Sequence, residues 1–514
     1  MPVNWVALAV FVAFFGFVTL VGFLAANWRR GDLGLLHEWG LGGGRFGTLV
    51  TWFLLGGDLY TAYTFIAVPA LAFGAGALAF FAVPYTTIVY PMTFVVFPRL
   101  WSVCRQHGYV TAADFVRGRF CNRWLALAIA ATGLLATMPY IALQLEGLQV
   151  VIAALGVGST GWLGEVPLIV SFVILAAFTY TSGLRAPAAI AIVKDVMIYI
   201  TIFAALIVIP AKLGGFSAIF AAIPAKNIIL PTPPAGSTGA YTSYATLALG
   251  SAAALFLYPH AITAVLSSSS RDVIRRNSAL LPAYSIVLAL IALLGFMAYA
   301  AHVDQNPAFK EMFGQYKANF AVPALFLQLF PDWFSGFAFA AIGIGALVPA
   351  AVMSIAAANL WTRNIYLEFI HPNATAAEES GMAKLFSLVV KFGALFFILF
   401  LPLDYAIQLQ LLGGVWMSQT LPAVLIGLYT RRLNSWALLL GWACGIGLGT
   451  WMVALTGFKN ATYAFTLFGL TIPAYAAIYG LIVNVLIAVL GTLVLDAVRG
   501  ASETRDNTVA ADYL

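Results

Sequence analysis

Charged residues are scarce in this chain: Asp, Glu, Lys and Arg together account for 9% of its 514 residues. About 25% of the residues of a typical soluble domain are charged, and a protein with so few charges cannot expose most of its surface to water. Hydrophobic residues reach 62%. The composition therefore excludes a soluble domain and predicts a membrane protein whose main surface partner is lipid.

Cysteine is also rare, and the three cysteines are Cys104, Cys121 and Cys444. This number and spacing exclude a disulfide framework and a cysteine-based metal site. The sequence has no HExxH, GxSxG or P-loop motif, so it supports neither an enzyme nor an ATP-driven pump. We expect no cofactor besides a coupling ion. The net charge of +6 is scattered over loops, which argues against a nucleic-acid partner.

Long apolar runs recur along the whole chain. A membrane-spanning helix needs about 20 mostly apolar residues, and thirteen segments qualify. They are 4–26, 46–73, 78–101, 124–156, 165–184, 187–210, 243–267, 279–301, 333–358, 382–402, 406–429, 435–457 and 466–496. The expected fold class is an all-α polytopic membrane protein, with residues 1–501 as a single transmembrane domain.

The segments between the spans are short, and their basic residues predict the orientation. Loops 211–242 and 302–332 are expected to form short helices over the bundle, and residues 502–514 a disordered tail. One set of loops holds nineteen of the 25 Lys and Arg residues, and the other holds Lys212, Lys226, Lys310, Lys317 and Lys459. Because cytoplasmic loops carry the excess of basic residues, we expect a periplasmic N-terminus and a cytoplasmic C-terminus.

The second span contains an interruption. Gly56 and Gly57 loosen the helix, and the carboxylate of Asp58 follows at once. Unwound backbone carbonyls and a carboxylate can bind a cation such as sodium. The alternative is a glycine packing contact with Asp58 as a cap of a neighbouring helix.

The seventh span contains a second interruption, at Tyr258, Pro259 and His260. Pro259 removes a backbone donor and kinks or breaks the helix. His260 can donate, accept or titrate near neutral pH. It is equally compatible with a satisfied core histidine, and the sequence does not decide between the two.

Other polar residues in the spans have a simpler explanation. Ser354 lies among small residues that allow close helix packing. The adjacent Lys194 and Asp195 lie near an expected helix end, so their side chains are expected to reach the cytoplasmic interface. Lys391, inside the tenth span, is expected to do the same.

Several strings together resemble the sodium:solute symporter family over nearly the whole chain. They are GYVTAADFVRGRF (108–120), YIALQLEG (140–147), TSGLRAPAAIAIVKD (181–195), LYPHAITAVLSSSSRD (257–272), AAVMS (350–354) and LPAVLIGLYTRRLNSWALLLG (421–441). Within the family, the strings that begin at residues 54 and 267 are most similar to the bacterial monocarboxylate permease branch.

The resemblance implies a LeuT-type core of two inverted five-helix repeats, in a bacterial inner membrane. The repeats would be 46–210 and 243–429, after a first span at 4–26 and before extra spans at 435–457 and 466–496. In such a core the second and seventh spans are the broken helices, which agrees with the two interruptions.

The resemblance also implies two sites. Its sodium ligands map to Gly56, Leu59, Ala351 and Ser354, and Asp58 and Asp195 match acidic residues near that site. The substrate side maps to Tyr63, Gln144, Tyr258 and His260.

Two residues depart from the family pattern. Ile355 stands where sodium-coupled relatives usually have Ser or Thr, which removes one oxygen ligand. Lys194 stands where Thr is usual, and in some sodium-independent carriers of this fold a lysine ammonium replaces the ion. We therefore hypothesise that Lys194 or Asp58 titrates and that H⁺ drives uptake, with Na⁺ as the other candidate ion.

The expected function is cation-coupled uptake of a small monocarboxylate such as lactate, pyruvate or propionate, with alanine as a further candidate. The alternative within the carrier class is a Na⁺-coupled symporter of proline, a sugar or another small solute. A channel needs a continuous polar stripe and a sensor needs an output domain, and the sequence has neither. It makes no prediction of the oligomeric state.

Overall fold

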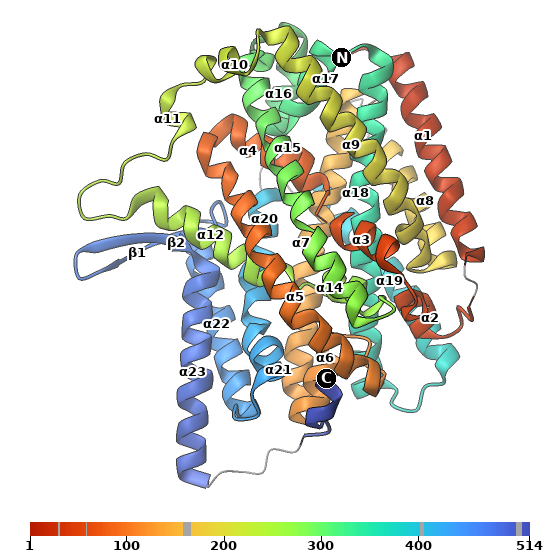
Figure 1. The fold of residues 1–514 in the computed structure, drawn as a ribbon, viewed down its shortest axis with the longest axis vertical. Helices are drawn as coiled ribbons and strands as arrows, with labels where there is room; N and C mark the ends of the chain where they lie inside the picture. Colours follow the sequence, from red (N-terminus) through yellow and green to blue (C-terminus); the bar gives the residue numbers. More distant parts are fainter. Residues whose placement is uncertain (29–30, 58, 158–165, 401–405, 500–505) are drawn as a thin grey trace.

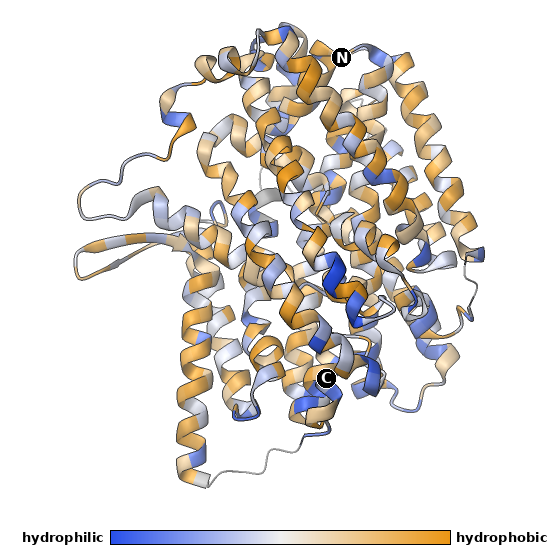
Figure 2. Ribbon diagram, in the orientation of Figure 1, coloured by the Kyte–Doolittle hydropathy of each residue, from blue (hydrophilic) through white to orange (hydrophobic). Residues whose placement is uncertain are grey.

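The computed structural model describes residues 1–28, 31–57, 59–157, 166–400, 406–499 and 506–514. They form a bundle of long helices, with the chain's two ends at opposite ends of the bundle (Figure 1). Hydrophobic residues line the outer helices, and hydrophilic residues gather at the end that holds the C-terminus (Figure 2). This end, which includes Arg99, Arg117, Arg119 and Arg431, is called the arginine-rich end below. Its cytoplasmic location stays a prediction.

The first half of the chain contains the first predicted repeat. Its elements are α1 (Trp5–Leu24), η1 (Ala25–Asn27), α2 (Leu36–Leu41), η2 (Gly42–Gly44), α3 (Thr48–Gly57), η3 (Tyr63–Ala67), α4 (Val68–Ala75), η4 (Gly76–Phe81), α5 (Ala82–His107), α6 (Ala112–Phe120), α7 (Arg123–Ala154), α8 (Val166–Ser182) and α9 (Arg185–Leu213). The next predicted loop forms α10 (Phe216–Ala222) and α11 (Ala225–Ile228), as expected.

The second half begins with α12 (Gly239–Leu255) and α13 (Pro259–Leu266). It continues with α14 (Arg271–Leu280), α15 (Pro282–Ala300), η6 (Val303–Gln305), η7 (Pro307–Phe309), α16 (Lys310–Tyr316), η8 (Lys317–Phe320), α17 (Ala321–Leu329), α18 (Asp332–Trp361), η9 (Thr362–Ile370), α19 (Ala376–Phe400), α20 (Ala406–Met417), η11 (Ser418–Thr420), η12 (Pro422–Ile426) and α21 (Gly427–Tyr429). Two further long helices, α22 (Ser435–Leu455) and α23 (Ala476–Arg499), pack against each other.

The protein is a multi-pass membrane protein. Within the described ranges, nine helical segments are long and apolar enough to cross a membrane, and α12 with α13 adds a tenth as a bent pair. Two more apolar helices, α3 and α8, are shorter. The expected number of thirteen spans stays a prediction.

The last predicted span, 466–496, is wrong at its start. Residues up to Tyr475 form an antiparallel hairpin of β1 (Thr462–Leu467) and β2 (Leu470–Tyr475), and the helix begins only at Ala476. The segment is apolar, but its Thr, Tyr, Ile and Phe residues favour strands, and Gly469 supplies the positive φ of the turn. The fold is therefore helical except for this hairpin.

The predicted disorder of residues 502–514 is also wrong for the part that the structure describes. Residues 506–514 lie against α5 and α6 and end in a short 3₁₀ turn, η13 (Ala510–Tyr513). Their side chains meet basic residues far away in the sequence, including Arg119 and Arg431. Residues 502–505 lie outside the described part.

Helix α18 is the centre of the bundle. It packs against α1, α7, α9 and α19, and every residue of its most apolar 18-residue window is buried. Its many Ala and Gly residues allow neighbouring helices to approach closely. The helices that form the candidate site therefore rest against one buried helix.

A similar close contact between α4 and α15 yields a prediction about stability. A Cβ on Gly295 of α15 would collide with the backbone carbonyl of Pro69 and lie 2.9 Å from the amide nitrogen of Phe73. Because backbone cannot move aside cheaply, we expect Gly295→Val to cost about 1–3 kcal/mol. Its apparent Tm in detergent should fall by several degrees.

Gly393 of α19 provides the matched control. A Cβ at Gly393 meets no described atom within 4 Å, so Gly393→Val should leave the Tm close to that of the unmodified protein. Equal Tm values for the two variants would contradict the packing of α4 against α15.

Candidate functional site

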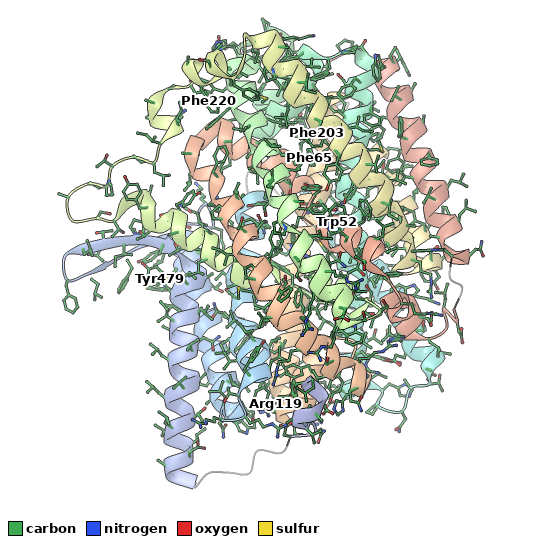
Figure 3. The ribbon with its side chains drawn as sticks, in the orientation of Figure 1. Trp52, Phe65, Arg119, Phe203, Phe220 and Tyr479 are labelled. Carbon is green, nitrogen blue, oxygen red and sulfur yellow. The ribbon has the colours of Figure 1, made fainter. Side chains whose placement is uncertain are left out.

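The second predicted span is broken where the glycine pair predicts it. Helix α3 ends at Gly57, and helical structure resumes only at Tyr63, in the π-helical turn η3. Trp52 of α3 and Phe65 of η3 mark the two sides of the break (Figure 3). Asp58, a predicted cation-coupling residue, lies outside the described residues.

A lysine ammonium from α9 lies against this break. Lys194 Nζ donates to the backbone carbonyl of Gly57 and, at 3.1 Å, to that of Tyr60. It also lies 3.1 Å from the Asp195 carboxylate, and both side chains are fully buried. The expectation that this pair reaches the cytoplasmic interface is therefore wrong, because the oxygen atoms that solvate the ammonium are inside the protein.

Gly57 explains how the ammonium reaches the backbone. A Cβ on Gly57 would lie only 3.0 Å from Lys194 Nζ and 3.2 Å from Asp195 Oδ2. A larger residue would therefore push the ion pair away from the carbonyls. The glycine that unwinds the helix also leaves the space that the cation occupies.

Two tyrosines complete this network, and no sequence pattern identified them. The Tyr284 hydroxyl of α15 donates to Asp195 Oδ2 at 2.6 Å. The Tyr60 hydroxyl donates to the backbone carbonyl of Tyr284 at 3.3 Å, and the two rings lie 4.5 Å apart. Aromatic residues are common in membrane proteins, so neither tyrosine stands out without its partners.

The four predicted sodium ligands have hydrogen bonds of their own. The Gly56 carbonyl accepts from the Leu59 amide at 2.9 Å, and the Leu59 carbonyl accepts from the Thr64 hydroxyl. Ser354 donates to the Ala351 carbonyl within α18 at 2.8 Å. The Lys194 ammonium instead contacts the carbonyls of Gly57 and Tyr60, which are adjacent to Gly56 and Leu59.

The seventh predicted span is broken as well. Helix α12 ends at Leu255, α13 begins at Pro259, and the two are bent by 47°. Tyr258, Tyr140 of α7 and His260 form an aromatic cluster at the bend, with ring centroids 5.2–5.5 Å apart. The Tyr258 hydroxyl is buried and has no hydrogen-bond partner among the described residues.

Helix α7 connects the two breaks. Gln144, one turn after Tyr140, accepts at 2.9 Å from the amide of Ala62 in the first break. Tyr63, which follows Ala62 in the chain, is buried in η3. The predicted substrate residues therefore lie on the two breaks and on the α7 segment between them.

Two cavities lie beside these breaks. A small apolar cavity of about 40 Å³ is lined by residues of both, including Leu59, Phe256 and Ala261. A second, of about 20 Å³, lies between Pro259 and Thr263 on one side and Val110 and Thr111, before α6, on the other. It therefore leads from the second break toward the arginine-rich end.

Two other buried charges differ from expectation. Glu146 of α7 was not predicted as a site residue, yet it is buried and accepts from Asn319 of η8 at 2.6 Å. Lys391 of α19 does not reach an interface: its side chain is fully buried, and Nζ has no hydrogen-bond partner within the described part of the chain. The expectation that Lys391 reaches the cytoplasmic interface is therefore wrong, because neighbouring helices cover α19 at this position.

Comparison with known proteins agrees with this arrangement. The model of the sodium:solute symporter family matches residues 39–445. A protein of Rhizobium johnstonii named monocarboxylate transport permease protein is 50% identical over 503 residues, covering 96% of this chain and 98% of the relative. An uncharacterized symporter of Bacillus subtilis, YodF, is 33% identical over 449 residues, covering 87% of each chain.

A solved structure shares the fold. It is a Na⁺-coupled sialic acid symporter in a substrate-bound outward-open state, with a TM-score of 0.77 and 15% identity, over 95% of this chain and 98% of that one. The likeness confirms the LeuT-type core that the family resemblance implies, and the two broken helices agree with it. On the family model and the relatives together, the chain belongs to the sodium:solute symporter family.

Proposed function

We propose that this protein is a proton-coupled symporter of small monocarboxylates in a bacterial inner membrane. The observation that carries the proposal is the buried Lys194 ammonium bound to the carbonyls of Gly57 and Tyr60. A cation supplied by the protein itself already occupies the oxygen-rich break. Acids of the lactate, pyruvate and propionate type are the proposed substrates, with alanine as a further candidate.

The proposed coupling follows from the chemistry of the amine. Protonated Lys194 holds two carbonyls of the unwound segment and balances the charge of Asp195. Loss of its proton removes the positive charge and weakens both carbonyl contacts. The segment between α3 and η3 is then free to rearrange, which links proton release to alternating access.

The second break supplies the proposed anion site. The N-terminus of α13 carries a partial positive charge that favours a carboxylate, and the unpaired Tyr258 hydroxyl can donate to it. The cavity that borders both breaks is apolar, which matches the small hydrocarbon part of such a substrate. The printed name of the Rhizobium relative supports the same class of substrate.

The alternative is sodium coupling with another small solute, such as proline or a sugar. The solved symporter of this fold is Na⁺-coupled, and this chain keeps a hydroxyl at Ser354. Lys194 favours the proton, because sodium and the ammonium compete for the same kind of oxygen ligand.

We predict that accumulation of labelled pyruvate in proteoliposomes follows a proton gradient. An inward proton gradient without sodium should drive uptake above that of protein-free liposomes, which measure passive entry of the free acid. An inward sodium gradient at equal pH should not drive uptake. Accumulation under the sodium gradient alone would contradict proton coupling while leaving the symporter assignment intact.

We predict that Lys194→Gln separates exchange from accumulation. Gln can keep a hydrogen bond to a carbonyl but cannot carry a proton. Proton-driven accumulation should fall at least about a hundredfold, the lower end of the usual scale for loss of a proton-transfer group. Counterflow of pyruvate at equal pH should persist.

Lys212→Gln is the control for this variant. Lys212 lies near the other end of the same helix and donates to the Leu329 carbonyl at the surface. The Lys212→Gln variant should retain proton-driven accumulation. Normal accumulation by Lys194→Gln would show that Lys194 is structural.

We predict that Tyr258→Phe raises the KM for pyruvate about tenfold or more, the effect expected for one lost hydrogen bond to a charged group. Tyr244→Phe is the control in the same helical pair, because the Tyr244 hydroxyl is already bonded to the Phe80 carbonyl. Initial rates over a range of pyruvate concentrations measure both. An unchanged KM for Tyr258→Phe would place the carboxylate elsewhere.

A further inference from the structure

The segment 506–514 is bound to the arginine-rich end by charged groups. Asp506 Oδ2 lies 3.0 Å from Arg119 Nη1 and 3.3 Å from Arg431 Nε. Asp512 Oδ2 lies 2.8 Å from His107 Nε2. The His107 imidazole and the Val509 amide hold the pKa of the Asp512 carboxyl below its usual value. Three charged or titratable groups of the bundle, Arg119, Arg431 and His107, thus fix a segment of only nine residues.

The residues that bind this segment come from the first predicted repeat and from the loop that follows the second. Arg119 belongs to α6, and its guanidinium also donates to the carbonyls of Gly427 and Thr430. Arg431 follows α21 and donates to the Thr508 carbonyl at 2.9 Å. Asp506 therefore bridges α6 of the first repeat and the 427–431 segment. Arg119 lies at the lower end of the bundle in Figure 3.

The contacts are of a kind that can be released. The Tyr513 side chain is buried, and the Arg99 guanidinium lies 4.8 Å from the centroid of the Tyr513 ring. In contrast, Val509 and Leu514 are 58% and 79% exposed, so little apolar surface holds the segment in place. Arg431 is about half exposed, whereas Arg119 and Asp506 are nearly buried, so the Arg431 contacts are the weaker and more salt-sensitive ones.

The segment also borders a cavity at the arginine-rich end. Asn507 lines a polar cavity of about 360 Å³ together with Tyr109, Asp114 and Arg117. Its backbone amide donates to the Gly118 carbonyl of α6 at 3.0 Å. The apolar cavity below Pro259 reaches Val110 and Thr111, at the start of the same helix. A restraint on α6 therefore acts where the two cavities approach each other.

We propose that residues 506–514 form a releasable latch that ties α6 to the 427–431 segment and slows the conformational cycle of the transporter. The inference goes beyond the proposed function, because it concerns the rate of the cycle and not the substrate or the ion. Release of the latch frees α6 to move relative to the second repeat.

Cys121 gives a readout that needs no substrate. It is a partly exposed residue at the end of α6, next to Gly118. In a Cys104→Ser, Cys444→Ser background in nanodiscs, a chain that ends at residue 505 should react with a charged maleimide at least about threefold faster, the factor for losing one partly exposed ion pair. Counterflow in proteoliposomes should accelerate by a similar factor.

Two neighbouring arginines give matched point variants. Arg431→Ala removes the contacts to Asp506 and Thr508 and should accelerate labelling and counterflow as the truncation does. The guanidinium of Arg432 has no ion pair among the described residues, so Arg432→Ala should change neither rate. A synthetic peptide of residues 506–514 added to the truncated protein should restore the slow rates, and a scrambled peptide should not.

Unchanged labelling and counterflow in the truncated protein would overturn the latch. Slower counterflow with a lower Tm would also overturn it, because the segment would then be a brace needed for the fold. Faster labelling that the peptide reverses supports the latch even if pyruvate is not the substrate.

Discussion

An ammonium group buried inside a membrane protein must be surrounded by oxygen atoms, and Lys194 meets this requirement because the helix that it faces is broken. In an intact α-helix the carbonyls of Gly57 and Tyr60 would accept from amides one turn further on. The interruption after α3 leaves them available to Nζ. Asp195 supplies the opposite charge, and Tyr284 donates a hydrogen bond to Asp195. Unwinding and ion pairing therefore support each other, since each satisfies groups that the other leaves without partners.

Both helix breaks could be predicted from the sequence, because their causes are local. A glycine pair weakens a helix wherever it lies, and Pro259 removes a donor whatever surrounds it. The depth of Lys194 could not be predicted in this way. Its position near the start of an expected span suggested an interface, whereas its burial depends on α3, more than a hundred residues away in the chain. Tyr60 and Tyr284 can likewise be distinguished from the other tyrosines only once the fold is known, because their partners are also distant in the chain.

The two errors near the end of the chain have related causes. Residues 462–475 are apolar enough to resemble part of a span, but β-favouring side chains and a turn at Gly469 make a hairpin. Residues 506–514 have the composition of a disordered tail, and Asp506 becomes ordered through arginines from α6 and the loop after α21. Local composition describes what a segment does alone, and long-range charge pairing changes that outcome.

The two breaks differ in which charge they can accommodate, and this difference suggests how the proposed coupling works. Carbonyl oxygens at the first break face a cation, whereas the N-terminus of α13 at the second break favours an anion. Helix α7 contacts both: Gln144 binds the amide of Ala62, and Tyr140 packs against Tyr258 and His260. In the proposed cycle, a movement of the first break is therefore transmitted to the second break through this α7 segment. A ligand that binds one arrangement of α7 more tightly shifts the population of the other site, so anion and proton need not touch to be coupled.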